Sequence, residues 1–513
     1  MVSRKLTLLM PALSLSAVLC LAEPPTSATL PGAVTESMER ISPASMRGHL
    51  SFLASDLLEG RNTPSRGLAI AAEYIAAQFR RTGLEPVPST KSHFQTAHWK
   101  LRKVDQQAAK ASLQHGEETL DLAGAQLTIL SLDGLKAEAP IYKLTWDEID
   151  KLKDQPEGAL AGNIVLIEAL SFARMRGLPN EERLSMMRRV SEFSKLAPKL
   201  KPDAVVAWNK DSTGDPDEAQ QLIDPESERR RSGRRFTPAA AVLHSPALAG
   251  VWEALPAGPT AAKLRIELPA GTEEPVDLHN VVGILPGSDP ELKNSYVLIT
   301  AHYDHVGIGE PDAKGDRIYN GANDDASGVV SMLEVAAAMA ASPQRPKRTV
   351  VFMALFGEER GLLGAKYYAG HPLFPVKDTA ANLNLEHMGR TDSSEGPQVA
   401  RLSPTGYTFS EITDVLKEGG ELTGVEIYHH QRNSDAYFNR SDNAAFADAG
   451  IPSTTVCVAF EFPEYHGAGD HWEKIDYENM AKVSRTVLAT TWLLAERPTP
   501  PAWKTDRYSR KTE

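Results

Sequence analysis

An alternation of buried-strand and helix patterns after residue 279 restricts the fold of this 513-residue chain more than any other feature. Continuous apolar runs at 296–300, 349–355 and 380–385 are typical of strands buried on both faces. Helical patterns at 327–341 and 361–369 follow the first two of these runs. The alternation predicts an α/β fold whose central sheet is mixed but mostly parallel, with helices covering both of its faces.

The rest of the chain divides into segments of different composition. Arg4 and Lys5 precede an uncharged apolar stretch that ends at Ala22, which is the pattern of a secretory signal peptide at 1–22. We expect a linker at 23–43, an N-terminal part of the catalytic domain at 44–119, a mostly β insert at 120–275, the main catalytic part at 276–496 and a loose tail at 497–513.

The leader predicts export to the periplasm or the medium, with no membrane span once the signal peptide is cleaved. An uncleaved N-terminal anchor is one alternative. Lipid attachment through Cys20 is a weaker one, because Leu19 is bulkier than that processing usually tolerates.

Charge and cysteine content exclude several classes of protein. The chain has 55 basic and 67 acidic residues, a net charge of −12, so we expect no nucleic-acid partner. Its two cysteines can form neither a disulfide framework nor a Cys-type zinc site. Cys457 lies in an apolar run and is expected to be a buried strand residue. Any chemistry must therefore come from histidines, carboxylates or hydroxyls.

Five short segments at the ends of these patterns carry such residues. They contain His302, Asp304 and His305; Asp324 and Asp325; Glu358 and Glu359; Glu386 and His387; and Tyr465, His466 and Asp470. Each segment alone is better explained as a helix cap or a satisfied loop side chain. Together they would meet at one sheet edge, where so many carboxylates repel one another unless a cation is present. Histidine and carboxylate ligands without thiolate favour a pair of zinc ions.

In this order the segments resemble the co-catalytic zinc exopeptidase family, which includes secreted bacterial aminopeptidases and glutamate carboxypeptidases. The resemblance covers about 280–495 and extends loosely to residues 56–61, and the 120–275 insert is similar to a protease-associated domain. It implies that His302 and Glu386 hold one zinc ion, that Glu359 and His466 hold the other, and that Asp324 bridges both. Many aminopeptidases of the family have Asp where Glu386 stands.

The resemblance also implies the catalytic groups. Glu358 corresponds to the general base, Asp304 to the acid that orients His302, and Tyr465 to a tyrosine that steadies the tetrahedral intermediate. Two zinc ions about 3.5–4 Å apart would share the attacking water. The expected activity is that of an exported aminopeptidase acting on peptides, and the oligomeric state is left open.

Alternatives within the same fold are a carboxypeptidase, a single-zinc acyltransferase similar to glutaminyl cyclases, and a receptor-like binding module. Arg390, Arg432 and Arg440 are candidates for holding a substrate carboxylate in the first case. The sequence contains no Gly-x-Ser-x-Gly, Gly-Lys or His-Glu motif, which disfavours a serine hydrolase and a P-loop enzyme and excludes a His-Glu-x-x-His metalloprotease.

Overall fold

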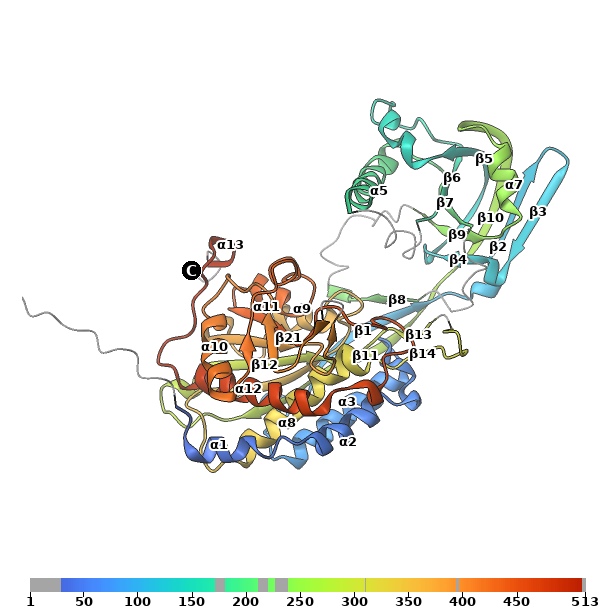
Figure 1. Cartoon of the computed structure of the whole chain (residues 1–513). Helices are drawn as coiled ribbons and strands as arrows, with labels where there is room; N and C mark the ends of the chain where they lie inside the picture. Colours follow the sequence, from blue (N-terminus) through green and yellow to red (C-terminus); the bar gives the residue numbers. More distant parts are fainter. Residues whose placement is uncertain are drawn as a thin grey trace, which may run out of the picture. The chain divides into compact units, whose positions relative to one another are not determined.

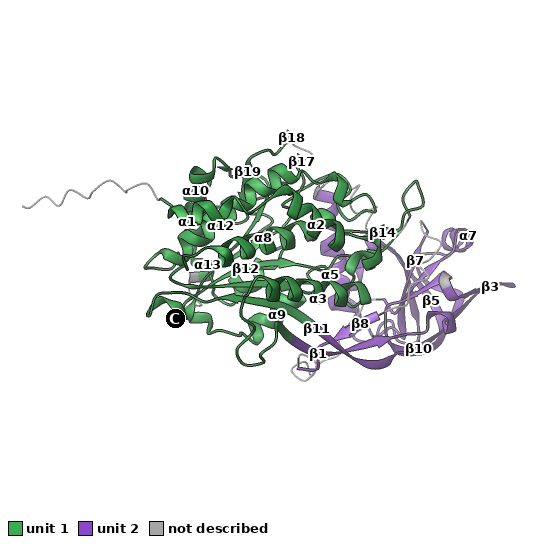
Figure 2. Ribbon diagram, turned by 90° about the horizontal axis from the view of Figure 1, so that it is seen from below, with its two compact units in different colours: residues 1–95, 279–513 green, residues 96–278 purple. Residues whose placement is uncertain are grey.

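The structure is a computed structural model that describes residues 29–170, 180–210, 220–226, 239–309, 311–393 and 396–509. The predicted signal peptide lies outside these residues, as does the first part of the predicted linker. The chain divides into two compact units, Met1–Gln95 with His279–Glu513 and Thr96–Leu278 (Figures 1 and 2). The second unit contains the predicted insert but begins upstream of it, so the segment predicted at 44–119 is shared between the units.

The first unit is built on a mixed sheet. Its strands run in the order β20 (Glu426–Ile427), β19 (Arg401–Pro404), β21 (Ser453–Cys457), β16 (Thr379–Leu385), β12 (Tyr296–His302), β15 (Thr349–Leu355) and β11 (Thr272–Leu285). β12 pairs in parallel with β15 and β16, and β16 pairs in parallel with β21. β11 and β19 flank this parallel core in antiparallel pairing. The carboxyl ends of the four parallel strands therefore lie at one edge of the sheet.

Helices cover both faces of this sheet (Figure 1). One face carries α1 (Gly32–Met38), α2 (Pro43–Leu53), α3 (Arg66–Arg81), α8 (Ser327–Ala341) and α12 (Tyr477–Glu496), and the other carries α9 (Leu363–Gly370) and α11 (Asn443–Asp448). α10 (Ile412–Thr423) packs against α12. α8 is buried along almost its whole length, because a helix that is apolar all round must be covered on every side. The predicted α/β class is confirmed.

Helix α3 shows how the sequence determines a helix of the covering layer. Ser65 caps its N-terminus by accepting a hydrogen bond from the Leu68 N–H at 3.0 Å. Ala71, Ile75 and Phe79 recur at a spacing of four residues and are all buried. The same periodicity predicted this helix.

A buried polar network fixes the parallel strands laterally. The Thr300 hydroxyl donates to Asn384 at 2.7 Å, and the Asn384 amide donates to Ser441 at 2.9 Å and to Thr455 at 3.0 Å. The Thr455 hydroxyl in turn donates to Asn443 at 2.8 Å. Because all five side chains are buried and hydrogen-bonded, the network specifies the register of β12, β16, β21 and the start of α11.

Part of the predicted linker is a helix instead. Residues 32–38 form α1, in which Val34 and Met38 are buried, and α1 packs against α8. The Pro-, Ser- and Ala-rich composition predicted an irregular segment, but tertiary packing of two apolar side chains outweighs weak local propensity.

The predicted loose tail is also ordered over its described part. Tyr508, in α13 (Asp506–Ser509), is 1% exposed and packs against Phe438, with ring centroids 5.4 Å apart. Trp503 lies 4.8 Å from the Tyr508 ring and forms a β-bridge with Ser410. Burial of Tyr508 and partial burial of Trp503 anchor a segment whose prolines and charges predicted a free end.

The second unit contains a sheet in the order β3 (Glu118–Ala123), β2 (Lys110–His115), β10 (Gly258–Ala270), β5 (Asp133–Leu144), β6 (Ile164–Glu168), β7 (Ala204–Asn209), β9 (Ala241–His244) and β4 (Leu127–Ile129). In β6, Ile164 and Leu166 join one apolar cluster while Val165 and Ile167 join another. α7 (Leu248–Ala254) contributes to the first cluster and α5 (Asn180–Leu200) to the second. β1 (Phe94–Lys103) pairs with β8 (Gln220–Ile223).

Two smaller expectations are also addressed by the structure. Cys457 is buried on β21, which confirms its interpretation as a buried strand residue. No helix among the described residues is both long enough and apolar enough to cross a membrane.

Replacing Tyr508 with alanine should lower the free energy of unfolding by about 3–5 kcal/mol, because the substitution removes a fully buried aromatic ring. Urea unfolding monitored by tryptophan fluorescence measures this change. The control is Asp506→Ala, which alters an exposed residue of the same helix and should change the stability by less than about 0.5 kcal/mol. Equal stability of both variants would show that the tail does not contribute to the core.

Candidate metal centre

The carboxyl-terminal edge of the parallel strands carries the residues that the sequence predicts as ligands. His302 ends β12, Glu359 lies between β15 and α9, and Glu386 directly follows β16. His466 lies in the loop after β21, and Asp324 lies in the segment Ala322–Ala326, which leads into α8 and has non-helical backbone dihedrals at Asp324 and Asp325. All of them belong to the first unit.

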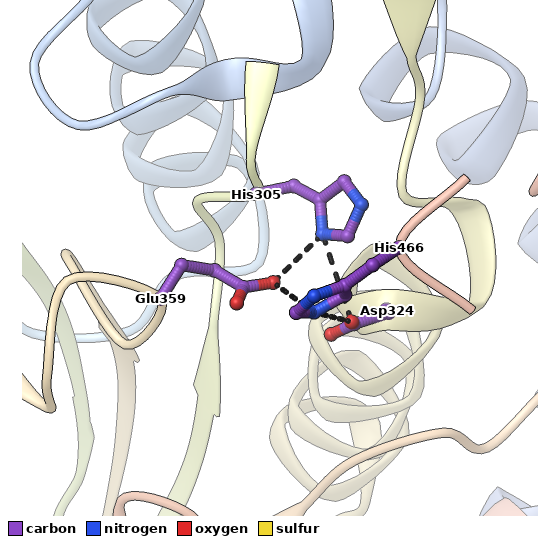
Figure 3. Close-up of side chains that lie close together, drawn as sticks. All are labelled: His305, Asp324, Glu359 and His466. Carbon is purple, nitrogen blue, oxygen red and sulfur yellow. Dashed lines mark ion pairs between the residues drawn. The ribbon is translucent and has the colours of Figure 1, made fainter. Parts of the chain in front are cut away.

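Four of the side chains converge on one point, and we call them the four-donor group: His305, Asp324, Glu359 and His466 (Figure 3). The His466 Nε2 atom is 3.1 Å from Asp324 Oδ2 and 3.1 Å from Glu359 Oε1. The His305 Nδ1 atom is 2.9 Å from Glu359 Oε1 and 3.7 Å from Asp324 Oδ2. The ligand atoms of the group all lie within 4.8 Å of one another.

A second set, which we call the three-donor group, consists of His302, Asp324 and Glu386. The His302 Nε2 atom is 3.3 Å from Asp324 Oδ1. Its ligand atoms also lie within 4.8 Å of one another, so the longer Glu386 side chain reaches the group. Asp324 belongs to both groups and turns a different carboxylate oxygen to the histidines of each.

The residues present fit metal ions at both groups. Within the described part of the chain, His302 Nε2, Asp324 Oδ2, Glu359 Oε1, Glu386 Oε2 and His466 Nε2 are buried atoms without a hydrogen-bond partner. Buried polar atoms without partners are costly, and a cation placed between them would remove that cost. Imidazole nitrogens and carboxylate oxygens without thiolates are a donor set that suits zinc.

Electrostatics keeps the acids of the four-donor group charged. Burial opposes ionisation of Asp324, yet the surrounding imidazoles hold the pKa of its carboxyl well below the usual range. Burial and the Asp324 charge act against Glu359 as well, but His305 and His466 lower its pKa to about 2. Desolvation acts to lower the pKa of His466, and the same two acids raise it to about 10. Ionised carboxylates are the form that binds a cation.

Two further acids hold the backbone around Asp324 in place. The Asp470 carboxylate accepts hydrogen bonds from the Asn323 N–H at 2.9 Å and the Asp324 N–H at 3.1 Å. The Asp325 Oδ1 atom accepts from the Gly328 N–H at 3.0 Å and the His387 N–H at 3.2 Å. These acids therefore fix the backbone of the loops that carry Asp324 and His387.

Asp304 contacts both His302 and the residue predicted as the base. The His302 Nδ1 atom donates to the Asp304 carbonyl at 3.2 Å and lies 3.6 Å from its carboxylate, which directs Nε2 toward the three-donor group. The Asp304 carboxylate also accepts the Glu358 N–H at 3.0 Å.

Comparison with known proteins agrees with this geometry. Residues 280–491, which contain both donor groups, match the sequence model of peptidase family M28. This segment, which is less than half of the chain, is similar to peptidase family M28. It supplies the parallel strands β12, β15, β16 and β21 and every residue of the four-donor and three-donor groups.

Curated relatives of the M28 segment are fungal proteins named probable zinc metalloproteases. One from Pyrenophora tritici-repentis is 31% identical over 263 residues, which cover 44% of this chain and 59% of that protein. One from Leptosphaeria maculans is 31% identical over 267 residues, with the same coverage of 44% and 59%. The chain thus spans less than two thirds of the length of these relatives.

Solved structures share the fold over most of the chain. An aminopeptidase from Aneurinibacillus sp. strain AM-1 has a TM-score of 0.58 at 20% identity, covering 91% of this chain and 97% of that one. A zinc aminopeptidase from Bacillus subtilis has a TM-score of 0.55 at 18% identity, covering 91% and 98%. At this level of identity the likeness establishes the fold.

Arg61 joins the N-terminal region to the loops of the M28 segment. Its buried guanidinium donates to the carbonyls of Tyr303 at 2.8 Å, Asn320 at 2.7 Å and Gly321 at 2.9 Å, and also to the Leu53 carbonyl. Desolvation lowers the pKa of Arg61 to about 10 despite the nearby carboxylates. The side chain thus ties together the loops that carry His302 and Asp324.

Aromatic side chains pack against two histidines of this region, His387 and His466. Tyr465 stacks on His466, with ring centroids 4.0 Å apart, and meets His387 edge-on at 5.4 Å. Phe462 lies 5.1 Å from the His387 ring. Burial raises the pKa of the Tyr465 hydroxyl, so the hydroxyl keeps its proton and can donate a hydrogen bond.

The five predicted ligands lie together at this edge of the sheet, and the sequence analysis assigned no role to His305, His387 or Arg61. His305 lies only three residues after His302, in a segment already singled out. A second histidine at that spacing, just beyond the end of a strand, is the sequence feature that could have indicated a further metal ligand.

Replacing Arg61 with methionine should lower the free energy of unfolding by about 3 kcal/mol, because the buried carbonyls would lose their donors. Thermal and urea unfolding measure the loss. Arg66→Met is the matched control, since Arg66 is exposed at the start of α3 and its replacement should have little effect. A variant at Arg61 as stable as this control would contradict the assigned role.

Proposed function

We propose that this chain is an exported, zinc-dependent aminopeptidase that hydrolyses the first peptide bond of peptide substrates. The observation that carries the proposal is the pair of donor groups that share Asp324, together with the half-buried Glu358. The names of the curated relatives support zinc-dependent proteolysis, and those of the structural neighbours support an aminopeptidase. The leader pattern at 1–22 supports export.

Glu358 is suited to act as the general base. Burial raises the pKa of its carboxyl well above the usual range, which makes the carboxylate a better proton acceptor near neutral pH. Its backbone N–H is anchored on Asp304, so the side chain starts from a fixed position. Glu358 would take a proton from the attacking water and return it to the leaving amine.

The other groups would stabilise the charge that develops during attack. Two bound zinc ions, held by the four-donor and three-donor groups, would lower the pKa of water and polarise the scissile carbonyl. The Tyr465 hydroxyl would donate a hydrogen bond to the developing oxyanion. The stacking of Tyr465 on His466 keeps the tyrosine ring beside the four-donor group.

Arg390, one of the three arginines considered for holding a substrate carboxylate, is already engaged within the protein. A carboxypeptidase needs a free cation for the terminal carboxylate of its substrate. Arg390 is 2% exposed and is already paired with Asp392 at 2.5 Å and with Glu464 at 3.0 Å. Its charge is therefore neutralised within the protein. The presence of two donor groups favours a two-ion centre over a single-zinc acyltransferase.

Replacing Glu358 with glutamine should reduce kcat by 10²–10⁴-fold, because the amide cannot accept the proton. The variant should still contain as much zinc as the unmodified protein, measured by elemental analysis, since Glu358 is in neither donor group. Glu421→Gln, an exposed change on α10, is the matched control and should retain full activity. Full activity of the Glu358 variant would contradict the assignment.

Substrates with a blocked N-terminal amine distinguish an aminopeptidase from a carboxypeptidase. Aminoacyl 4-nitroanilides with a free amine should be hydrolysed, whereas their N-acetylated counterparts should react at least about 100-fold more slowly. A peptide with a free C-terminus and a blocked N-terminus should remain intact by mass spectrometry. Release of its C-terminal residue would instead establish a carboxypeptidase.

A further inference from the structure

His305 adds a sixth side chain to the centre, beyond the five that the sequence predicts as metal ligands. Its Nδ1 atom is 2.9 Å from Glu359 Oε1, closer than the 3.1 Å at which His466 Nε2 approaches the same oxygen. The ring is completely buried. It therefore occupies the four-donor group as fully as the predicted ligand His466 does (Figure 3).

Hydrogen bonding does not account for this position. Among the described residues, His305 Nδ1, Asp324 Oδ2, Glu359 Oε1 and His466 Nε2 are all buried and all lack a hydrogen-bond partner, although they lie 2.9–3.7 Å apart. A short separation without hydrogen-bond geometry means that the atoms do not point at one another. Atoms that point instead at a common centre have the arrangement of ligands around a cation.

The backbone holds the imidazole in this place. The His305 N–H donates to the Arg61 carbonyl at 3.3 Å, and Arg61 is itself fixed by the carbonyls that its guanidinium binds. Gly321, at φ +59°, leaves the room that the ring needs, since a Cβ atom there would lie 2.5 Å from His305 Cγ. The position of His305 is therefore built into the fold.

The two donor groups are consequently unequal. The four-donor group offers two imidazoles and two carboxylates, and the three-donor group offers one imidazole and two carboxylates. His387 lies near the latter, with Nε2 3.7 Å from Asp324 and 3.8 Å from Glu386, but it is not among the atoms within 4.8 Å of one another. Four protein ligands close a tetrahedral zinc site, whereas three leave a position open for water or substrate.

We propose that His305 is a protein ligand of the metal ion at the four-donor group, so that this ion is held firmly and the ion at the three-donor group exchanges readily. The inference rests on the proposed two-zinc function and deepens it. Under this proposal, the open ligand position lies at the three-donor group, which contains His302 and Glu386. Loss of His305 should therefore weaken binding of the ion at the four-donor group more than binding of the ion at the three-donor group.

Zinc retention tests the proposal. The full-length protein is loaded with zinc and dialysed against increasing concentrations of dipicolinate, and the zinc bound per chain is measured by elemental analysis. The unmodified protein should lose one ion first and retain the second to chelator concentrations at least about tenfold higher. Even groups that only support metal ligands contribute 10–100-fold to affinity, so a direct ligand should contribute no less.

Two substitutions of equal size separate ligation from packing. His305→Asn should release both ions over the same chelator range, whereas His305→Asp, which supplies a carboxylate ligand of the same shape, should recover most of the retention. His387→Gln is the control, because it removes an imidazole near the three-donor group. This variant should still retain the ion at the four-donor group. Circular dichroism establishes that each variant is folded.

Retention of the second ion in His305→Asn at the level of the unmodified protein would overturn the proposal. Equal behaviour of the Asn and Asp variants would also overturn it, because packing alone would then explain the ring. A protein that hydrolyses aminoacyl substrates but loses both ions together would contradict this inference and leave the proposed function intact. A protein that neither binds zinc nor hydrolyses peptides would overturn the proposed function itself.

Discussion

The sharing of one buried carboxylate by two sets of donors is the constraint on which the arrangement of the site depends. Asp324 turns Oδ1 to His302 at 3.3 Å and Oδ2 to His466 at 3.1 Å, so neither group is complete without it. A lone buried carboxylate would take up a proton, but the surrounding imidazoles hold its pKa well below the usual range. The two backbone N–H groups anchored on Asp470 prevent the turn around Asp324 from relaxing.

The sheet supplies the rigidity that this arrangement needs. Parallel pairing of β12, β15, β16 and β21 brings residues far apart in the sequence to a single edge. The buried network around Asn384 fixes the lateral register, and Arg61 ties the loops beyond the strands to the N-terminal region. Ligand atoms must be placed to within a fraction of an ångström, which loops alone do not achieve.

Much of this could be predicted from the sequence, because it depends on patterns that are local. The run at 349–355 coincides with β15, and the helical pattern at 327–341 coincides with α8. The helix at 32–38 and the ordered tail were not predicted, since both depend on tertiary burial of Val34 and Tyr508 that composition does not reveal. His305 was overlooked for a related reason: spacing places it near a strand end, but only the fold brings it to 2.9 Å from Glu359.

Two metal ions are proposed to occupy this edge of the sheet, with Asp324 between them. Anomalous X-ray scattering from crystals of the zinc-loaded protein, recorded at the zinc absorption edge, tests this proposal most directly. The account predicts two peaks, one enclosed by His305, Glu359 and His466 and one beside His302 and Glu386, with Asp324 contacting both. A single peak, or zinc bound away from Asp324, would contradict it.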